Sequence, residues 1–222
     1  MKSIVACILL LILCLSADRV FGIMRSPNPD FDLISGSALP AETRQPAQDL
    51  LLYSNRWYSK WLYLEQEHGA RLVVVDVYDP TKLNVVAIVP TGLAKPFDLI
   101  QVPNKHYAIA RFRDGSGAEM LDLSRPRAPR LSAARPRLGE YSLPKQRADF
   151  PGIELRAEES SVGEGQDLEF VRQGAVPRLL AAVPNVSRLA YRTETGTFFL
   201  AGRQGLVIIR QHSIEEAWDP TY

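Results

Sequence analysis

The feature that most constrains the fold is a phrase of nine residues that recurs along the chain. It occurs as Ala128–Pro136 and Val176–Pro184, and a looser copy occupies Lys82–Pro90. Repeats with a period of about 40 to 50 residues are typical of proteins built from stacked units, in which each unit buries its apolar faces against its neighbours. The chain is therefore expected to fold as a stack of similar units.

The first 22 residues have the features of a secretory signal peptide. Lys2 precedes the apolar stretch Ile4–Leu15, which is shorter than the ~20 residues that a membrane-spanning helix needs. Ala17 and Gly22 offer two cleavage positions. We predict a secreted or periplasmic protein with no stable membrane span after cleavage. The alternative is a membrane-anchored protein that keeps this segment.

Cysteine content and net charge indicate how the domain is stabilised and which partners it suits. Both cysteines, Cys7 and Cys14, lie inside the signal segment, so the cleaved chain would contain no thiol. Burial of apolar residues alone must then hold the exported domain together. The net charge is +1, which creates no overall field that favours nucleic acid, and none is predicted as a partner.

After the signal helix the chain divides into an arm and a repeat region. Residues 23–49 are rich in proline and poor in periodic apolar residues, which predicts a flexible, loosely held arm. A short strand around Phe31–Ile34 is its one candidate element. Residues 50–222 contain run after run of β-branched and aromatic residues and no convincing helical periodicity. The predicted fold class is all-β.

Aligning the repeats gives four units, each with a lead strand, a second strand, a third apolar strand and a last strand. The third strands are predicted at Leu72–Val77, Ala118–Leu123, Leu168–Arg172 and Leu206–Arg210. Four-stranded blades stacked around an axis bury both faces of each sheet. We therefore predict a β-propeller of about four four-stranded blades.

Closing such a ring requires an outer strand for the last unit. Either Ile214–Trp218 or the arm around Phe31–Ile34 is expected to supply it. A third possibility is an open arc that closes by pairing with another chain. A closed ring of four blades is the first expectation.

Two segments carry a resemblance to a known family. Leu72–Pro80 (LVVVDVYDP) and Ala118–Pro126 (AEMLDLSRP), the latter preceded by the lead strand Phe97–Ile100, resemble the signature of the LVIVD-repeat family of β-propellers. The third and fourth units lack both the aspartate and the turn that follows it. The resemblance implies a propeller scaffold and no particular reaction, because unrelated functions share such scaffolds.

The sequence contains no familiar catalytic or cofactor motif. A nucleophile elbow, a phosphate-binding loop and a dinucleotide fingerprint are all missing. His68, His106 and His212 are far apart and show no metal-binding spacing. No cofactor, metal site or catalytic residue is predicted, and binding is a better expectation than enzyme activity.

Charged residues gather at two places. Glu65 and Glu67 share one face of a strand end, where paired carboxylates either serve acid–base catalysis or solvate a hairpin, and solvation is the expectation. Basic residues crowd Arg125–Arg147, and acidic residues follow in Asp149–Glu169. The two runs either form a basic face for a polyanion or neutralise each other, and neutralisation is expected.

Six residues are the candidates for binding. The third strands make four positions equivalent, namely Asp76, Asp122, Arg172 and Arg210. These four would hold a ligand or ion if they met at the axis, and would be structural if they paired with backbone at the sheet edges. The main aromatic concentration adds Trp57 and Trp61, which suit either a sugar or protein partner or the core.

These observations lead to one expected function and one alternative. We expect an exported, non-enzymatic β-propeller that binds a protein or glycan partner through loops at one end of the ring. The alternative is a hydrolase or lyase whose site lies at the central channel.

Overall fold

The computed structural model describes residues 26–54, 59–103, 106–134, 136, 150, 152–160 and 165–218. The predicted signal peptide, Trp57 and the expected lead strand of the third unit, Glu140–Leu143, lie outside the described residues. The described part consists of antiparallel strands with a few short helical turns, which confirms the all-β prediction. Within it, no helix is long and apolar enough to cross a membrane.

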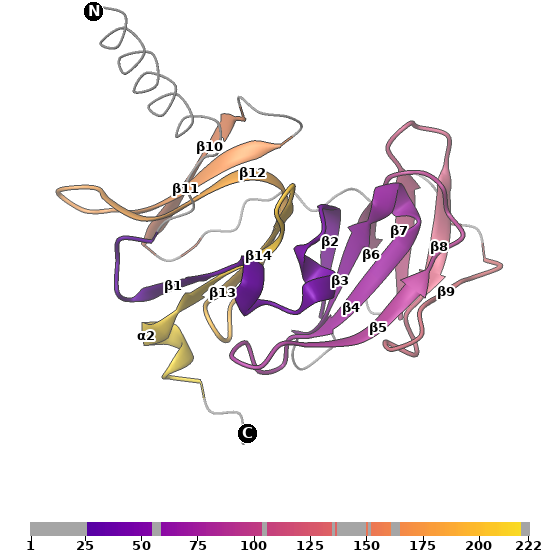
Figure 1. Cartoon of the computed structure of the whole chain (residues 1–222), viewed down its shortest axis with the longest axis horizontal. Helices are drawn as coiled ribbons and strands as arrows, with labels where there is room; N and C mark the ends of the chain where they lie inside the picture. The colour runs from indigo at the N-terminus through magenta and orange to yellow at the C-terminus, as the bar shows by residue number, and fades with distance from the viewer. Residues whose placement is uncertain are drawn as a thin grey trace, which may run out of the picture.

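The described strands form three antiparallel sheets (Figure 1). Sheet 1 consists of β2 (Ala47–Ser54), β3 (Ser59–Gln66), β4 (Arg71–Asp76) and β5 (Asn84–Pro90). Sheet 2 consists of β6 (Phe97–Gln101), β7 (Tyr107–Phe112), β8 (Ala118–Asp122) and β9 (Arg130–Leu131). Sheet 3 has six strands in the order β1 (Phe31–Ile34), β14 (Gly205–Gln211), β13 (Thr197–Gly202), β12 (Arg178–Arg192), β11 (Gln166–Arg172) and β10 (Ile153–Glu159).

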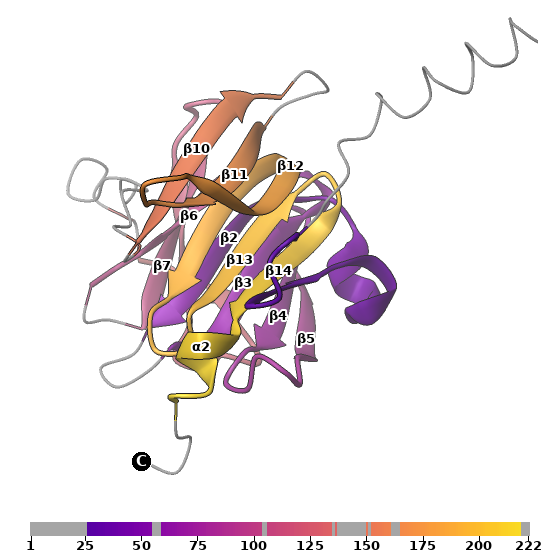
Figure 2. The same ribbon diagram turned by 90° about the vertical axis from the view of Figure 1, so that its left-hand side faces the viewer.

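Alternating apolar residues let each inner sheet bury both of its faces. On β4, Val73 and Val75 pack toward sheet 3, whereas Leu72 and Val74 pack toward sheet 2. All four side chains are at most 1% exposed. Successive side chains of a strand point to opposite faces, so a continuous run of valine and leucine requires a partner on each side. Sheet 1 accordingly lies between the other two (Figures 1 and 2).

Sheet 3 differs from the expected four separate four-stranded blades. The last strand of the third unit and the lead strand of the fourth are one continuous strand, β12, of 15 residues. Its first half pairs with β11 and its second half pairs with β13. The two units therefore share one folded sheet.

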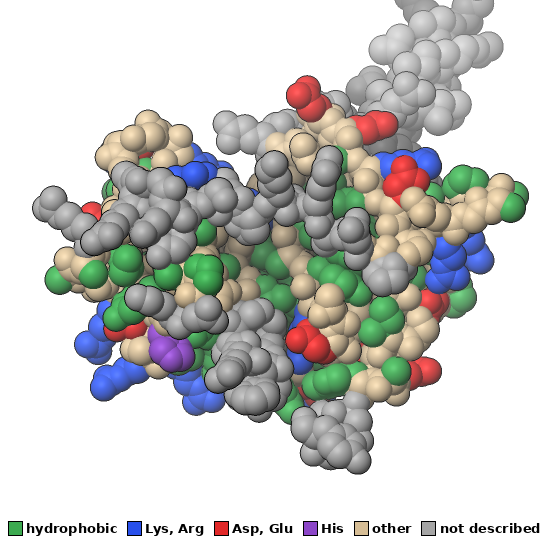
Figure 3. All heavy atoms as spheres, turned by 180° about the vertical axis from the view of Figure 1, so that it is seen from behind, with side chains coloured by type: hydrophobic (Ala, Val, Ile, Leu, Met, Phe, Trp, Pro, Cys, Tyr) green, Lys and Arg blue, Asp and Glu red, His purple; other side chains and the backbone are tan. Residues whose placement is uncertain are grey.

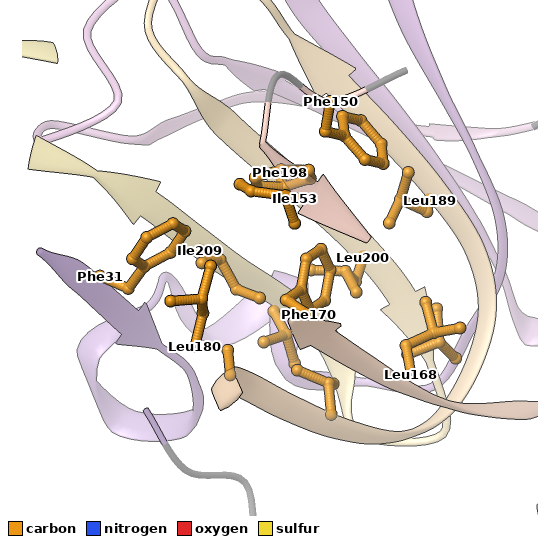
Figure 4. Close-up of a cluster of buried hydrophobic side chains, with 14 residues drawn as sticks. Phe31, Phe150, Ile153, Leu168, Phe170, Leu180, Leu189, Phe198, Leu200 and Ile209 are labelled. Atoms are coloured by element: carbon orange, nitrogen blue, oxygen red, sulfur yellow. The ribbon is translucent and has the colours of Figure 1, made fainter. Parts of the chain in front are cut away.

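A core of apolar side chains fills the inside of this folded sheet (Figure 4). Phe170 of β11 and Phe198 of β13 meet edge to face, with their ring centroids 4.9 Å apart. Phe150 contacts Phe198 in the same manner at 4.8 Å. Burial of these rings and of the aliphatic side chains around them is what holds the two halves of the sheet together.

A kink in β12 allows the strand to change partners. Asn185 has a φ of +54° in the middle of the strand, a conformation that is uncommon for residues other than glycine. Two glycines make room for this backbone. A Cβ on Gly202 would lie 2.1 Å from the Asn185 carbonyl oxygen, and one on Gly165 would lie 3.1 Å from the Asn185 carbonyl carbon.

The predicted flexible arm is ordered from residue 26 and completes the last unit. β1 pairs antiparallel with β14, and Phe31 is only 3% exposed within the core of sheet 3. Two short 3-10 turns, Gly36–Ala38 and Ala41–Arg44, then lead into β2. Of the two expected sources of an outer strand, the arm is therefore the right one. The other prediction is wrong, because His212–Glu215 forms the helical turn α2.

Candidate functional site

The two predicted aspartates each accept a backbone hydrogen bond in a turn. The backbone N–H of Tyr78 donates to Asp76 Oδ1 at 3.0 Å, and that of Ser124 donates to Asp122 Oδ1 at 2.8 Å. Hydrogen bonds from the backbone and the hydroxyl of Ser124 lower the pKa of Asp122. Each aspartate thus closes the turn after a third strand, which is the structural alternative for these positions.

The two predicted arginines hold the ends of the chain against sheet 3. Arg172 Nη2 lies 3.3 Å from Asp30 Oδ2, in the arm. Arg210 donates twice to Glu215 of α2, at 2.9 and 2.7 Å. The four third-strand residues are therefore engaged locally, each at its own strand end, and none of them lines the pocket described below.

Trp61 belongs to the core. Its side chain is 9% exposed, in the cluster between sheets 1 and 2, and the Arg127 guanidinium lies 5.8 Å from the centre of its ring. Core packing was expected between the first and last units, whereas the structure places it between the first and second. The histidines stay apart, and the described residues contain no group of three side chains suited to a metal ion.

Glu65 and Glu67 do not act as a pair. Glu67 begins a 3-10 turn and forms an ion pair with Arg71 at 3.1 Å at the surface. Glu65 is fully buried and lies directly opposite Asp49 of β2 across the sheet. The carboxylate pair that the fold creates is therefore Asp49 with Glu65.

Asp49 links all three sheets. One oxygen, Oδ2, accepts a short hydrogen bond from the backbone N–H of Leu99 in β6, and Oδ1 lies 3.1 Å from Arg188 Nε in β12. The side chain is 1% exposed. Burial raises the pKa of Asp49 to about 6, although Arg188 and the Leu99 N–H both favour the ionised form.

Glu65 lies beside Asp49 and is also destabilised in its charged form. Burial raises its pKa to about 7, with Arg113 lowering it and Asp49 raising it. The backbone N–H groups of Gly69 and Gln48 also lower the pKa, and they offset only part of the effect of burial. A protonated Glu65 is the less costly state in this environment.

A pocket of about 870 Å³ opens beside this cluster. All three sheets contribute to its wall, and its principal polar side chains are Gln48 of sheet 1, Asp98 and Arg113 at the edge of sheet 2, and Gln166, Ser187 and Arg188 of sheet 3. Asp49 and Glu65 are not among its lining residues. The pocket therefore lies in front of the buried carboxylates.

Irregular pairing concentrates at the pocket. The strand registers skip Gln48 in β2, Asp167 in β11 and Ser187 in β12. Bulges of this kind turn side chains and backbone groups away from the ladder, and they are over-represented next to functional sites. The left-handed Asn185 lines the same pocket. The strands thus depart from regular sheet geometry beside the pocket.

The polar groups of the pocket are held in place. Arg113 Nε donates to Asp98 Oδ1 at 2.9 Å, and its Nη2 donates to the Gln48 carbonyl. Arg188 is fixed by Asp49. Gln48 Oε1 is buried and has no hydrogen-bond partner among the described residues. Such an acceptor is costly unless something donates to it.

Charges of both signs occur on the described part of the face seen in Figure 3. Basic and acidic side chains are interspersed there around hydrophobic ones. The pocket likewise pairs arginine with aspartate. A ligand that suits it is polar and carries little net charge.

Sequence patterns do not point to this site. Asp49, Asp98 and Arg188 are far apart in the chain and belong to no motif. An isolated acid just before an apolar strand, as at Asp49, is the one local hint. No family model matches the chain, and no curated protein matches it.

Proposed function

We propose that this protein is an exported, non-enzymatic binding protein that holds a glycan in the polar pocket at one end of its stacked sheets. The observation that carries the proposal is the convergence of three sheets on one pocket lined by amide, hydroxyl and charged side chains. Ligand pockets are concave, and about 300 to 1,000 Å³ is their usual size. The scaffold we infer is a propeller-type stack of four LVIVD-like units.

The chemistry of the lining favours a glycan over a protein. Interfaces with proteins concentrate binding energy in tryptophan and tyrosine side chains, and the described lining contains neither. It contains amides, hydroxyls and arginines, which match a ligand bearing many hydroxyl groups. Two of the three lining arginines, Arg113 and Arg188, are paired with aspartates, and Arg203 and Glu159 add one charge of each sign, so a neutral or weakly charged sugar chain fits better than a polyanion.

The alternative is a hydrolase or lyase that uses the same pocket. Carboxyl groups with pKa values near 6 and 7 are suited to acid–base catalysis, and Asp49 and Glu65 have such values. Both side chains are fully buried behind the lining, which places them out of reach of a substrate. Binding is therefore the function we propose.

The test is a binding screen with the mature chain against soluble oligosaccharides, neutral and uronic-acid-containing, followed by titration calorimetry with the best binder. Gln166 is an exposed residue of the pocket wall, so Gln166→Trp should fill the pocket and weaken binding at least about tenfold. Gln48→Ala should weaken it by about threefold to tenfold, because a polar side chain of the pocket wall is lost.

The matched control is Gln173→Trp, which places the same side chain at an exposed turn outside the pocket and should leave the affinity unchanged. An equal loss of oligosaccharide affinity in Gln166→Trp and Gln173→Trp would refute the assignment of the pocket. A screen in which no oligosaccharide binds would refute it as well. Release of sugar fragments during the titration would instead identify the hydrolase or lyase.

A further inference from the structure

A second concave surface is lined by residues of β5 and β9 and of the loops beside them. These are the outer strands of sheets 1 and 2 (Figure 1). This groove has a volume of about 460 Å³ and is lined by Ala87–Thr91 and by Arg127–Leu131. It shares no lining residue with the polar pocket. Any ligand of the groove is therefore separate from the proposed glycan.

Both walls of the groove are sheet edges. β5 is the last strand of sheet 1, and β9, the last strand of sheet 2, pairs through only Arg130 and Leu131. An edge strand presents backbone N–H and C=O groups on its outer side, and an extended peptide can add to them as a further strand. The groove thus offers main-chain hydrogen bonds as well as side-chain contacts.

Exposed apolar side chains gather here. Among the described residues, the large hydrophobic side chains that are exposed are Ile88, Leu131 and Val176. Ile88 is 47% exposed and Leu131 is 44% exposed, and both line the groove. Proteins rarely leave such side chains together on an edge without a partner.

The charge of the groove indicates which partner it fits. Its charged lining residues are Arg127 and Arg130, and no acidic residue lines it within the described part of the chain. Arg127 and Arg130 are both exposed, and the Arg127 guanidinium also lies over the Trp61 ring. A peptide that alternates acidic and apolar side chains complements this surface, because strand residues point alternately to its two sides.

The shape of β5 argues against pairing with a second copy of the chain. The register between β4 and β5 skips Val86, so β5 carries a bulge in its middle. Bulges on edge strands hinder long, regular pairing between sheets. Within β5, only the stretch from Ala87 to Pro90 lines the groove, which is enough for a short peptide but not for a second sheet.

We propose that the groove between β5 and β9 binds an extended peptide segment with alternating acidic and apolar residues, which adds to β5 as an extra strand. The apolar side chains of the peptide contact Ile88 and Leu131, and its acidic side chains pair with Arg127 and Arg130. The protein would then join a glycan to a protein through two separate surfaces.

The experiment uses a short fluorescein-labelled peptide of alternating glutamate and valine, with fluorescence anisotropy as the readout. The glutamate peptide should bind at least about tenfold more tightly than the same peptide with lysine in place of glutamate. N-methylation of alternate backbone nitrogens should weaken binding to a similar degree, because the peptide can no longer donate to the edge strand.

Charge reversal at the groove supplies the decisive comparison. Arg130→Glu should weaken the glutamate peptide about tenfold and strengthen the lysine peptide, and Ile88→Asp should abolish binding of the glutamate peptide, because it removes the apolar contact and adds a charge of the same sign as glutamate. The matched control, Arg178→Glu, reverses an exposed arginine outside the groove and should change neither affinity. Circular dichroism of each variant establishes that it is folded.

Three results would overturn the proposal. The first is absence of binding, and the second is binding that Arg130→Glu leaves unchanged. The third is self-association of the chain, measured by sedimentation, that Ile88→Asp abolishes, because it would assign the groove to a second copy. The pocket variant Gln166→Trp should bind the peptide normally, so failure of the glycan proposal does not affect this outcome.

Discussion

Asp49 connects three sheets through one carboxylate. It accepts the Leu99 N–H from sheet 2 and lies 3.1 Å from Arg188 of sheet 3, while its own strand belongs to sheet 1. Removing one member of a buried ion pair costs about 3 to 5 kcal/mol, because the other charge is left without compensation. The cluster therefore holds the sheets in register behind the pocket.

The raised carboxyl pKa values predict how stability depends on pH. In the unfolded chain Asp49 and Glu65 titrate near 3.8 and 4.5, and in the folded chain near 6 and 7. Their protonated forms stabilise the fold fully below about pH 4, and this contribution is lost as the pH rises through 6 and 7. The free energy of unfolding should thus be larger at pH 5 than at pH 8, by about 2 to 4 kcal/mol for the two carboxyls together.

Urea denaturation at the two pH values measures this difference. Glu65→Gln, which cannot ionise, should lose part of the pH dependence. Unfolding free energies that are equal at pH 5 and pH 8, or larger at pH 8, would show that the two carboxyls are not destabilised by burial.

Sequence reasoning succeeded at the residues whose partners are local. Asp76 and Asp122 were identified as equivalent, and both accept the N–H of the residue two positions later. Asp49 and Arg188 were missed, because their contact depends on how two sheets meet. The residue pattern within one strand does not show which residues of another sheet will pack against it.

At the scale of elements, β12 shows that the pattern of apolar runs does not determine where one strand ends and the next begins. Most predicted strands are confirmed, because runs of β-branched and aromatic residues bounded by turn residues specify them locally. The repeated phrase ends at Pro184, yet β12 continues through it to Arg192. The kink at Asn185 and the glycines that admit it are tertiary features that the repeat pattern does not encode.

A substitution at Gly202 tests the close approach of the backbone at the Asn185 kink. Gly202→Ala places a Cβ 2.1 Å from the Asn185 carbonyl oxygen, so the backbone must shift, and we expect a loss of about 1 to 3 kcal/mol in unfolding free energy. Gly174→Ala is the matched control, because the nearest atom to its Cβ is 4.0 Å away. Thermal denaturation of the two variants measures the effect. Equal midpoints would contradict the close approach at Gly202.

At the scale of the whole molecule, stacking is what creates both surfaces. Sheet 1 is covered on its two faces by sheets 3 and 2, and the arm completes sheet 3 by pairing with β14. The all-β class and a stack of units followed from the repeats. The six-stranded sheet and the polar pocket did not, because both depend on how neighbouring units join.

The most direct test of the account is hydrogen–deuterium exchange of the mature chain, with and without its best-binding oligosaccharide. We expect exchange to slow in three separate stretches at once, around Gln48, Arg113 and Ser187, because sheets 1, 2 and 3 each contribute to the pocket wall. Protection confined to a single sheet, or located away from these stretches, would contradict the assignment of the pocket as the binding site.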